Sequence, residues 1–448
     1  MNNEVFEKAP VPKAIATLAI PTMLSMLVTI FYNMADTFFV GQTGDPNQVA
    51  AVSITTPIFL LLMAVGNMFG IGGSSYISRL LGAGETKKVK KVSSFCCYGS
   101  IAAGLIMMVL FLVGMPSILN FVGTSQNTYA FAKDYLTIIG YGSVFVVFST
   151  AFGNVVRGEG AAKEAMIGMM LGTVINIILD PIMILVLDMG VSGAALATII
   201  GNFGACLYYI YYFLKKKTVL SISPKDFQMG EHILPSVLSV GIPASLNNVL
   251  MSVSNVIMNI FLVKYGDAQV AAMGVAQKAN MLIILLCIGL ASGIQPLIGY
   301  CYGGKHTARL KKTMKLAMII SVIMGSLITV VYFAFAGQIV RAFISDKDVI
   351  GYGIIMLRAL MLSGPIIGIM FVFNFAFQAM GKATYSLILT LGRQGLFFVP
   401  ILFIANKLIG LNGVVYAQPI ADYAAIVISV VMFLHIKKEL DKMTVPGV

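Results

Sequence analysis

The sequence is poor in charged residues, in histidine and in cysteine, and each shortage excludes a class of protein. Charged side chains make up 11% of the 448 residues and hydrophobic ones 58%, a balance too apolar for a soluble globular protein of this length. The 5 cysteines lie in or beside apolar runs without the spacing of metal ligands, so we expect reduced thiols in the core. No Walker sequence is present, and no histidine or serine constellation falls within an apolar run, so neither ATP use nor an enzyme is expected.

Apolar runs of about 20 residues recur along the chain between short charged segments. Each run is long enough to cross roughly 30 Å of hydrocarbon as a helix. We count about twelve of them and predict an all-α integral membrane protein. Residues 1–13 are polar, and the first apolar run is too long for the core of a cleavable signal peptide, so no signal peptide is expected.

Basic residues, which give the chain a net charge of +12, gather in alternate loops. The clusters fall within residues 87–91, 215–217, 305–315 and 437–442. By the positive-inside rule these loops and both termini are cytoplasmic, which requires an even number of crossings. No soluble domain is left to present a basic surface, so nucleic-acid binding is not expected.

The second half of the sequence repeats the first at a spacing of about 220 residues. The matched pairs include Ile20-Pro21 with Ile242-Pro243, Gly44-Asp45 with Gly266-Asp267, and QVAAVSI with QVAAMGVA. We therefore predict an N-lobe over residues 1–214, a cytoplasmic linker over 215–232 and a C-lobe over 233–448. Six helices in each lobe give both copies one orientation, so the lobes should be related by a pseudo-two-fold axis along the membrane normal. Transporters with such repeats hold substrate between the halves and alternate access by rocking.

Polar side chains interrupt the apolar runs of the first half. Asn176 and Asp180 are four residues apart and share one helix face, and Asp36 and Thr198 lie in other runs. A carboxylate near the middle of a membrane helix costs roughly 2.5–3.5 kcal/mol, so it is kept where something polar or ionic meets it. Two carboxylates, an amide and a hydroxyl are hard oxygen donors that suit Na⁺, and two nearby carboxylates equally suit a shared proton. These four residues are the predicted cation or proton site.

The repeat provides an internal control for this prediction. Asp36 aligns with Met258, Asp180 with Val399 and Asn176 with Gly395, so the second half lacks the acids. Residues that only shape the fold should match between the two copies, whereas residues with a chemical role can be present in one copy alone. The asymmetry therefore favours an ionic role in the N-lobe.

The second half carries its own polar and charged residues within apolar runs. Lys278, Arg358, Arg393 and Asp422 lie about ten residues from a predicted helix end and form either a structural ion-pair layer or a contact surface for substrate. Methionine and aromatic side chains repack around varied amphipathic molecules. The predicted substrate cavity comprises Asn255, Met258, Asn259, Gln277, Lys278, Gln295, Arg358, Phe371, Gln378 and Asp422.

Several motifs together resemble the multidrug and toxic compound extrusion (MATE) family, in its MepA-like bacterial branch. They are IPTMLSMLVTIFYNMADTFFVG, GNMFGIGGSSYISRLLGAG, RGEGAAK, NIILDP and GVSGAALAT. The resemblance implies a monomeric antiporter of the bacterial plasma membrane. It would export drug-like, often cationic compounds in exchange for Na⁺ or H⁺ and need no other cofactor. The family's N-lobe cation site would fall on Asp36, Asn176, Asp180 and Thr198. Some branches carry acids in helices 7 and 10 of the C-lobe, and this chain has none there.

Two alternatives differ from this interpretation. A flippase or exporter of a lipid-linked or anionic metabolite is favoured by Lys278, Arg358 and Arg393. A membrane receptor or scaffold is a third class, but it would not explain acids that occur in only one of the two repeats.

Overall fold

The computed structural model describes residues 4–215, 218–230 and 232–443, apart from the side chains of residues 4, 33, 36, 37 and 443. Every regular element in these ranges is helical, which confirms the predicted all-α class. The first half contains η1 (Glu4–Lys8), α1 (Val11–Gly41), α2 (Pro46–Gly82), α3 (Thr86–Phe121), α4 (Gln126–Tyr141), α5 (Ser143–Gly158), α6 (Ala162–Pro181), η2 (Ile182–Val186) and α7 (Gly190–Lys215). The second half contains η3 (Pro224–Asp226), α8 (Ile233–Val263), α9 (Asp267–Gly303), α10 (Thr307–Phe343), α11 (Lys347–Met361), α12 (Gly364–Ala379), α13 (Ala383–Leu391), η4 (Gly392–Leu396), α14 (Phe398–Ile409) and α15 (Leu411–Met443).

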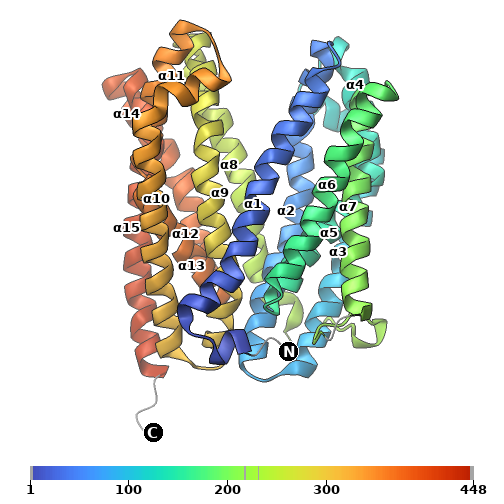
Figure 1. The fold of residues 1–448 in the computed structure, drawn as a ribbon, viewed down its shortest axis with the longest axis vertical. Helices are drawn as coiled ribbons and strands as arrows, with labels where there is room; N and C mark the ends of the chain where they lie inside the picture. The colour runs from blue at the N-terminus through green and yellow to red at the C-terminus, as the bar shows by residue number, and fades with distance from the viewer. Residues whose placement is uncertain (1–3, 216–217, 231, 444–448) are drawn as a thin grey trace. The chain divides into compact units, whose positions relative to one another are not determined.

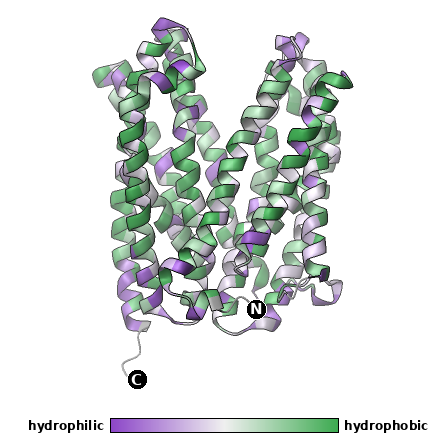
Figure 2. Ribbon diagram, viewed as in Figure 1, coloured by the Kyte–Doolittle hydropathy of each residue, from purple (hydrophilic) through white to green (hydrophobic). Residues whose placement is uncertain are grey.

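Membrane-spanning helices account for nearly all of the described chain. Ten are long and apolar enough to cross a bilayer, and there are twelve candidate spans when two bent pairs are each counted once. These pairs are α4 with α5, bent by 57°, and α11 with α12, bent by 49°. Figure 2 shows hydrophobic residues over the middle of the long helices and hydrophilic residues toward their ends. The composition therefore predicted both the class and the span number.

By the contacts of their backbones, the described residues form two compact units. Unit 1 comprises Met1–Ala9 and Leu24–Ser245, and unit 2 comprises Pro10–Met23 and Leu246–Val448. The first part of α1 thus packs with the second half of the chain, and the first part of α8 packs with the first half. The predicted lobes are continuous stretches of sequence, unlike these units. The predicted lobe boundary at residues 215–232 stays a prediction.

In unit 1, α2 packs against α3, α4 and α5, while α6 packs against α7 (Figure 1). Glycines allow the close approach of α2 and α5, because a Cβ added to Gly70 would lie 2.9 Å from the Cα of Ala151. The core contains Phe69, Cys96, Phe152 and Tyr209, all buried. All five cysteines are free and buried, as the sequence predicted.

In unit 2, α9 packs against α10, α11 and α12, and α14 packs against α15. The two halves share the breaks between their helices. Gly44 before α2 and Gly266 before α9 both have a positive φ, at 73° and 128°. The bend between α4 and α5 at Gly142 is matched by the bend between α11 and α12 near Ser363. These matches follow the repeat found in the sequence.

Candidate functional site

Three of the four predicted coupling residues are buried together in unit 1. Asn176 and Asp180 belong to α6, Thr198 belongs to α7, and their exposed fractions are 2%, 0% and 4%. The side-chain amide of Asn176 donates from Nδ2 to Thr198 Oγ1 at 3.2 Å. The structure therefore joins the two helices through residues that the sequence picked out separately.

The close approach of α6 and α7 explains this contact. A Cβ added to Gly201 would lie 2.5 Å from the Gly172 carbonyl oxygen, and one added to Gly172 would lie 2.7 Å from the Gly201 carbonyl oxygen. Only glycine at both positions permits this separation. Asn176 lies one turn after Gly172, so the glycine contact brings its amide within reach of α7.

Pro181 ends α6 directly after Asp180. Proline has no N–H to donate, so the carbonyl of Ile177 lacks its usual partner four residues on. A π-helical turn, η2, follows, and its end is closed by a hydrogen bond from Leu187 N to Ile182 O at 2.9 Å. Such turns often occur at functional sites. The carboxylate thus sits where the regular helix changes form.

Asp36, the fourth predicted coupling residue, lies in α1, but its side chain is outside the described part of the structure. Its proposed meeting with Asp180 therefore stays a prediction. One turn earlier on α1, Tyr32 places its hydroxyl 3.4 Å from Thr198 Oγ1. A contact between α1 and α7 is thus present at this site.

Two further polar residues adjoin the site and were not predicted. Asn202 donates from Nδ2 to the Thr198 carbonyl at 2.8 Å, and its Oδ1 accepts from Ser149 Oγ at 2.7 Å. Tyr32 was also missed. Tyr32 lies four residues before Asp36, and Asn202 lies four residues after Thr198. Each could therefore have been placed on the same helix face as a predicted site residue.

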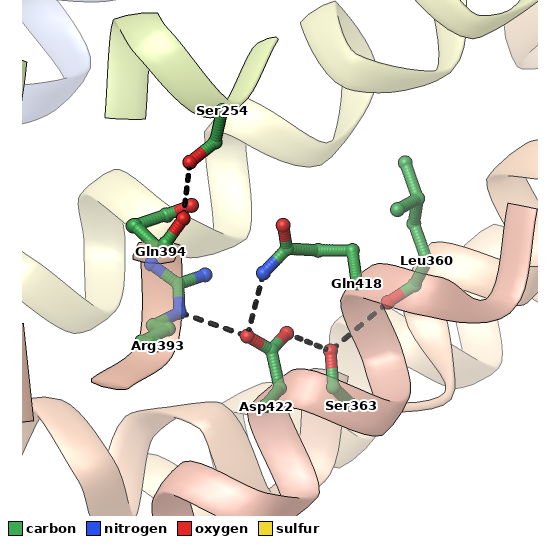
Figure 3. Close-up of polar contacts among 7 residues, drawn as sticks. All are labelled: Ser254, Leu360, Ser363, Arg393, Gln394, Gln418 and Asp422. Carbon is green, nitrogen blue, oxygen red and sulfur yellow. Dashed lines mark hydrogen bonds and ion pairs between the residues drawn. The ribbon is translucent and has the colours of Figure 1, made fainter. Parts of the chain in front are cut away.

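Unit 2 holds a buried ion pair at its own polar centre (Figure 3). Arg393 of η4 donates from Nε to Asp422 Oδ1 of α15 at 2.8 Å, and the two side chains are 6% and 4% exposed. Gln418 donates to the same oxygen at 2.9 Å, and Ser363 donates to Oδ2 at 2.8 Å. The guanidinium carbon lies 5.4 Å from the ring centre of Phe371. Asp422 therefore accepts three hydrogen bonds.

Similarity to known proteins gives this arrangement its context. A model of the MatE family matches residues 21–182 and again residues 243–404. The chain belongs to the MatE family. The two matches start at the prolines that the repeat analysis paired and confirm that the chain contains two copies of one unit.

Relatives of this MatE protein match it over nearly its full length. Multidrug export protein MepA of Staphylococcus saprophyticus is 35% identical over 417 residues, which cover 93% of this chain and 92% of the relative. A crystal structure of a MATE protein in complex with MaL6 superimposes with a TM-score of 0.92 at 28% identity and 98% coverage of both chains. A transporter of the MOP superfamily from Pyrococcus furiosus, described as having a binding pocket of reverse polarity that suggests a different function, has a TM-score of 0.90 at 28% identity. That match covers 99% of this chain and 98% of the other.

Membership in the MatE family settles the broad class. The chain is a multi-pass membrane transporter and not an enzyme, as the sequence predicted. Transporters of this family are coupled to ions. The predicted resemblance to the MATE family is confirmed.

Of the residues predicted to line a substrate cavity, Gln277 contacts both Asn255 and Met258 in this MatE structure. Gln277 donates to Asn255 Oδ1 at 3.3 Å and lies 3.4 Å from the sulfur of Met258. Gln378 donates to Ser386 Oγ at 3.1 Å. Gln295, Phe371, Gln378 and Asp422 are buried, whereas Asn259, Lys278 and Arg358 are exposed.

The four charges of the second half do not form one layer. Arg393 pairs with Asp422, whereas Arg358 donates from Nη2 to the Phe333 carbonyl of α10 at 3.1 Å. No ion pair of Lys278 or Arg358 occurs in the part of the chain that the structure describes. The sequence hypothesis of a charged layer is therefore reduced to one buried pair.

The turn after α5 contains a third buried carboxyl, that of Glu159. Glu159 is 9% exposed and accepts from Thr218 Oγ1 at 2.8 and 2.7 Å, from Val219 N at 3.3 Å and from the Tyr212 hydroxyl. Burial raises the pKa of Glu159, and these hydrogen bonds offset part of the rise. Arg157, two residues earlier, donates from Nη1 to Asn154 Oδ1 at 3.1 Å.

Proposed function

We propose that this MatE-family chain exports drug-like, often cationic amphipathic compounds in exchange for Na⁺ or H⁺ entering the cell. The multidrug export named in its MepA relative supports the substrate class. The observation that carries the coupling role is the fully buried Asp180 beside Asn176 and Thr198, in one copy of a duplicated scaffold. We further propose that substrate and ion bind to the protein alternately and cross the membrane by rocker-switch alternating access.

The chemistry of the site fits an entering cation. A carboxylate excluded from water favours either a bound proton or a bound cation, because both neutralise its negative charge. The amide of Asn176 donates from its nitrogen to Thr198, so its oxygen is the atom that could ligate Na⁺. The Thr198 hydroxyl and Asp180 supply further hard oxygen donors. In this proposal Asp36 completes the set from α1.

The membrane potential and the ion gradient both supply free energy. One positive charge moved through 100 mV contributes about 2.3 kcal/mol, enough for a gradient of several tens-fold in a neutral substrate. When a monovalent cationic substrate leaves for each cation that enters, the electrical contributions cancel. Export is then driven by the ion gradient alone.

Ethidium transport by the purified protein in liposomes tests this proposal, with Na⁺ and pH gradients imposed separately. We expect one of the two gradients to drive transport, and Asp36→Asn and Asp180→Asn to abolish it with normal protein yield. Asp134→Asn is the matched control, since Asp134 is an exposed acid on α4 of the same unit. Undiminished gradient-driven transport by both variants would remove the coupling role.

The orientation and the oligomeric state are also proposals. The clusters of basic residues in alternate loops support cytoplasmic termini in the bacterial plasma membrane. We propose a monomer as the transporting form. Labelling of a single cysteine introduced near Lys438, from each side of the membrane, tests the orientation.

A second candidate function, export of a lipid-linked or anionic metabolite, has one observation in its favour. The buried Arg393 supplies hydrogen-bond donors for an acidic group at the polar centre of unit 2, where Asp422 balances its charge. Comparing transport of a cationic dye with flipping of an anionic lipid in the same liposomes distinguishes the two functions.

A further inference from the structure

The ion pair of unit 2 has unused hydrogen-bond donors on one side only. Asp422 accepts from Arg393, Gln418 and Ser363, so both of its carboxylate oxygens have partners. Arg393 uses Nε alone, and no dashed contact in Figure 3 reaches its Nη nitrogens. Among the described residues these two nitrogens, which carry four N–H groups, have no hydrogen-bond partner.

Hydrogen-bond donors are costly to leave without acceptors in a buried side chain, and the side chain of Arg393 is only 6% exposed. The Nη nitrogens are also absent from the buried polar atoms that lack partners, so they keep some accessible surface. A hydrogen-bond acceptor that reaches these nitrogens meets the open edge of a guanidinium.

The surroundings of Arg393 fix the direction of this edge. Asp422 holds the Nε side, and the guanidinium carbon lies over the ring of Phe371. Arg393 lies in the π-helical turn η4, which is closed by a hydrogen bond from Phe397 N to Gly392 O at 2.8 Å. Ser254 of α8 donates to the carbonyl of Gln394 in this turn at 2.6 Å. A rigid guanidinium with one free edge is the geometry that binds an oxyanion through two parallel hydrogen bonds.

We propose that Arg393 recognises the carboxylate of a zwitterionic amphipathic substrate, with Asp422 as its positioning residue. This inference rests on the proposed export function and specifies a class of its substrates. Because Arg393 and Asp422 are together neutral, a bound anion would leave a net negative charge in a medium of low dielectric constant. A zwitterion brings its own balancing positive charge and avoids this cost.

Equilibrium binding of two matched dyes to the purified protein tests the inference directly. The dyes are a rhodamine with a free carboxylate, which is a zwitterion, and its ethyl ester, which is a cation with the same ring system. Arg393→Lys keeps the positive charge that Asp422 needs but removes the forked Nη edge. We expect the ratio of acid to ester affinity to fall by about tenfold or more in Arg393→Lys, as for the loss of a charge-assisted hydrogen bond.

Arg341→Lys is the matched control, since Arg341 lies exposed at the end of α10 and should leave the affinity ratio unchanged. A second variant, Arg393→Met with Asp422→Leu, removes the pair without leaving an unpaired charge and should lower the ratio in the same way. The inference is overturned if the ratio in both variants equals that of the wild type, or if the wild-type protein binds neither dye.

The same dyes separate this inference from the proposed function. Transport of the ester in liposomes, driven by a Na⁺ or pH gradient, reports on ion-coupled export. Wild-type protein that binds the acid through Arg393 but transports neither dye would refute the export function and leave the binding site standing. If the ester is transported and the ratio of acid to ester affinity is unchanged in the Arg393 variants, the export function stands and the proposed binding role of Arg393 is refuted.

Discussion

The contact between α6 and α7 offers a sharp test of the coupling site, because it depends on two glycines and not on the charged residues themselves. In Gly201→Ala the new Cβ would lie 2.5 Å from the Gly172 carbonyl oxygen and 3.2 Å from the Cβ of Asn176. Ordinary contacts of this kind are near 3.5 Å, so the helices must separate by roughly 0.5–1 Å. Such overpacking costs about 1–3 kcal/mol.

This separation acts on the hydrogen bond between Asn176 and Thr198. The bond is 3.2 Å long in the native protein, and a further 0.5 Å or so would take it beyond hydrogen-bonding distance. A hydrogen bond of this type contributes about 0.5–1.5 kcal/mol. We therefore expect the half-saturating concentration of the driving ion to rise about 3–10-fold in Gly201→Ala, or the midpoint pH to shift correspondingly if the ion is a proton.

The same substitution three residues later is the control. A Cβ on Gly204 would lie 2.5 Å from Cδ1 of Ile175, which is the end of a flexible side chain and can move aside. Ion dependence is measured by dye transport in liposomes, and folding by the melting temperature in detergent. A folded Gly201→Ala protein with the ion dependence of Gly204→Ala and the wild type would refute the proposed role of this contact.

Three further predictions concern single polar groups. Thr198→Val should raise the half-saturating concentration of the driving ion by about 2–10-fold, because it removes one hydrogen bond and one oxygen donor. A variant whose ion titration matches that of the wild type would contradict this. Since burial raises the pKa of Glu159, its contribution to stability is complete at low pH and is lost as the pH rises through that raised pKa. Glu159→Gln should therefore lose less stability than the wild type between acidic and neutral pH, whereas the exposed Glu85→Gln should follow the wild type in the same melting series. Asp422→Asn leaves Arg393 without its charge partner and should lower the melting temperature more than Arg393→Met with Asp422→Leu, and the opposite order would contradict the pairing.

Much of the fold follows from patterns that the sequence carries openly. Apolar runs of about 20 residues predicted the spans, and matched motifs such as Gly44-Asp45 and Gly266-Asp267 predicted the duplication. The bends within two spans were not predicted. Gly142 and Ser363 interrupt long helical runs whose composition stays apolar on both sides, so hydropathy shows no boundary there.

The candidate site was only partly predictable for a different physical reason. The spacing of Asn176 and Asp180 places them on one helix face, and the repeat shows that the second half lacks them. Contacts with other helices, such as that of Asn176 with Thr198, depend on helix rotation and distance, which the Gly172 and Gly201 contact sets. The sequence shows the glycines but not which helix they face.

The charged residues of the second half illustrate the same limit. The sequence left two roles open for these four charges, an ion-pair layer or a contact surface for substrate. Among the described residues Arg393 pairs with Asp422, because the π-helical turn η4 places Arg393 near α15. No composition rule marks a π-helical turn. Arg358 instead reaches a carbonyl of α10 from an exposed position.

The two copies of the repeat differ in the hydrogen-bonding groups that they leave for a ligand. Thr198 and Asn202 in the first copy align with Gln418 and Asp422 in the second, so the polar centres occupy equivalent positions of one scaffold. The first centre buries Asp180, Asn176 and Thr198, whose oxygen atoms are of the type that suits a cation. In the second centre the acid is satisfied by three donors and the open groups are N–H donors of Arg393, which suits an acceptor on the substrate. A duplicated transporter that carried the same chemistry in both copies would let ion and substrate compete for identical sites. Because the centres differ in this sense, the coupling ion and an acidic group of the substrate can be recognised by separate copies of the same fold.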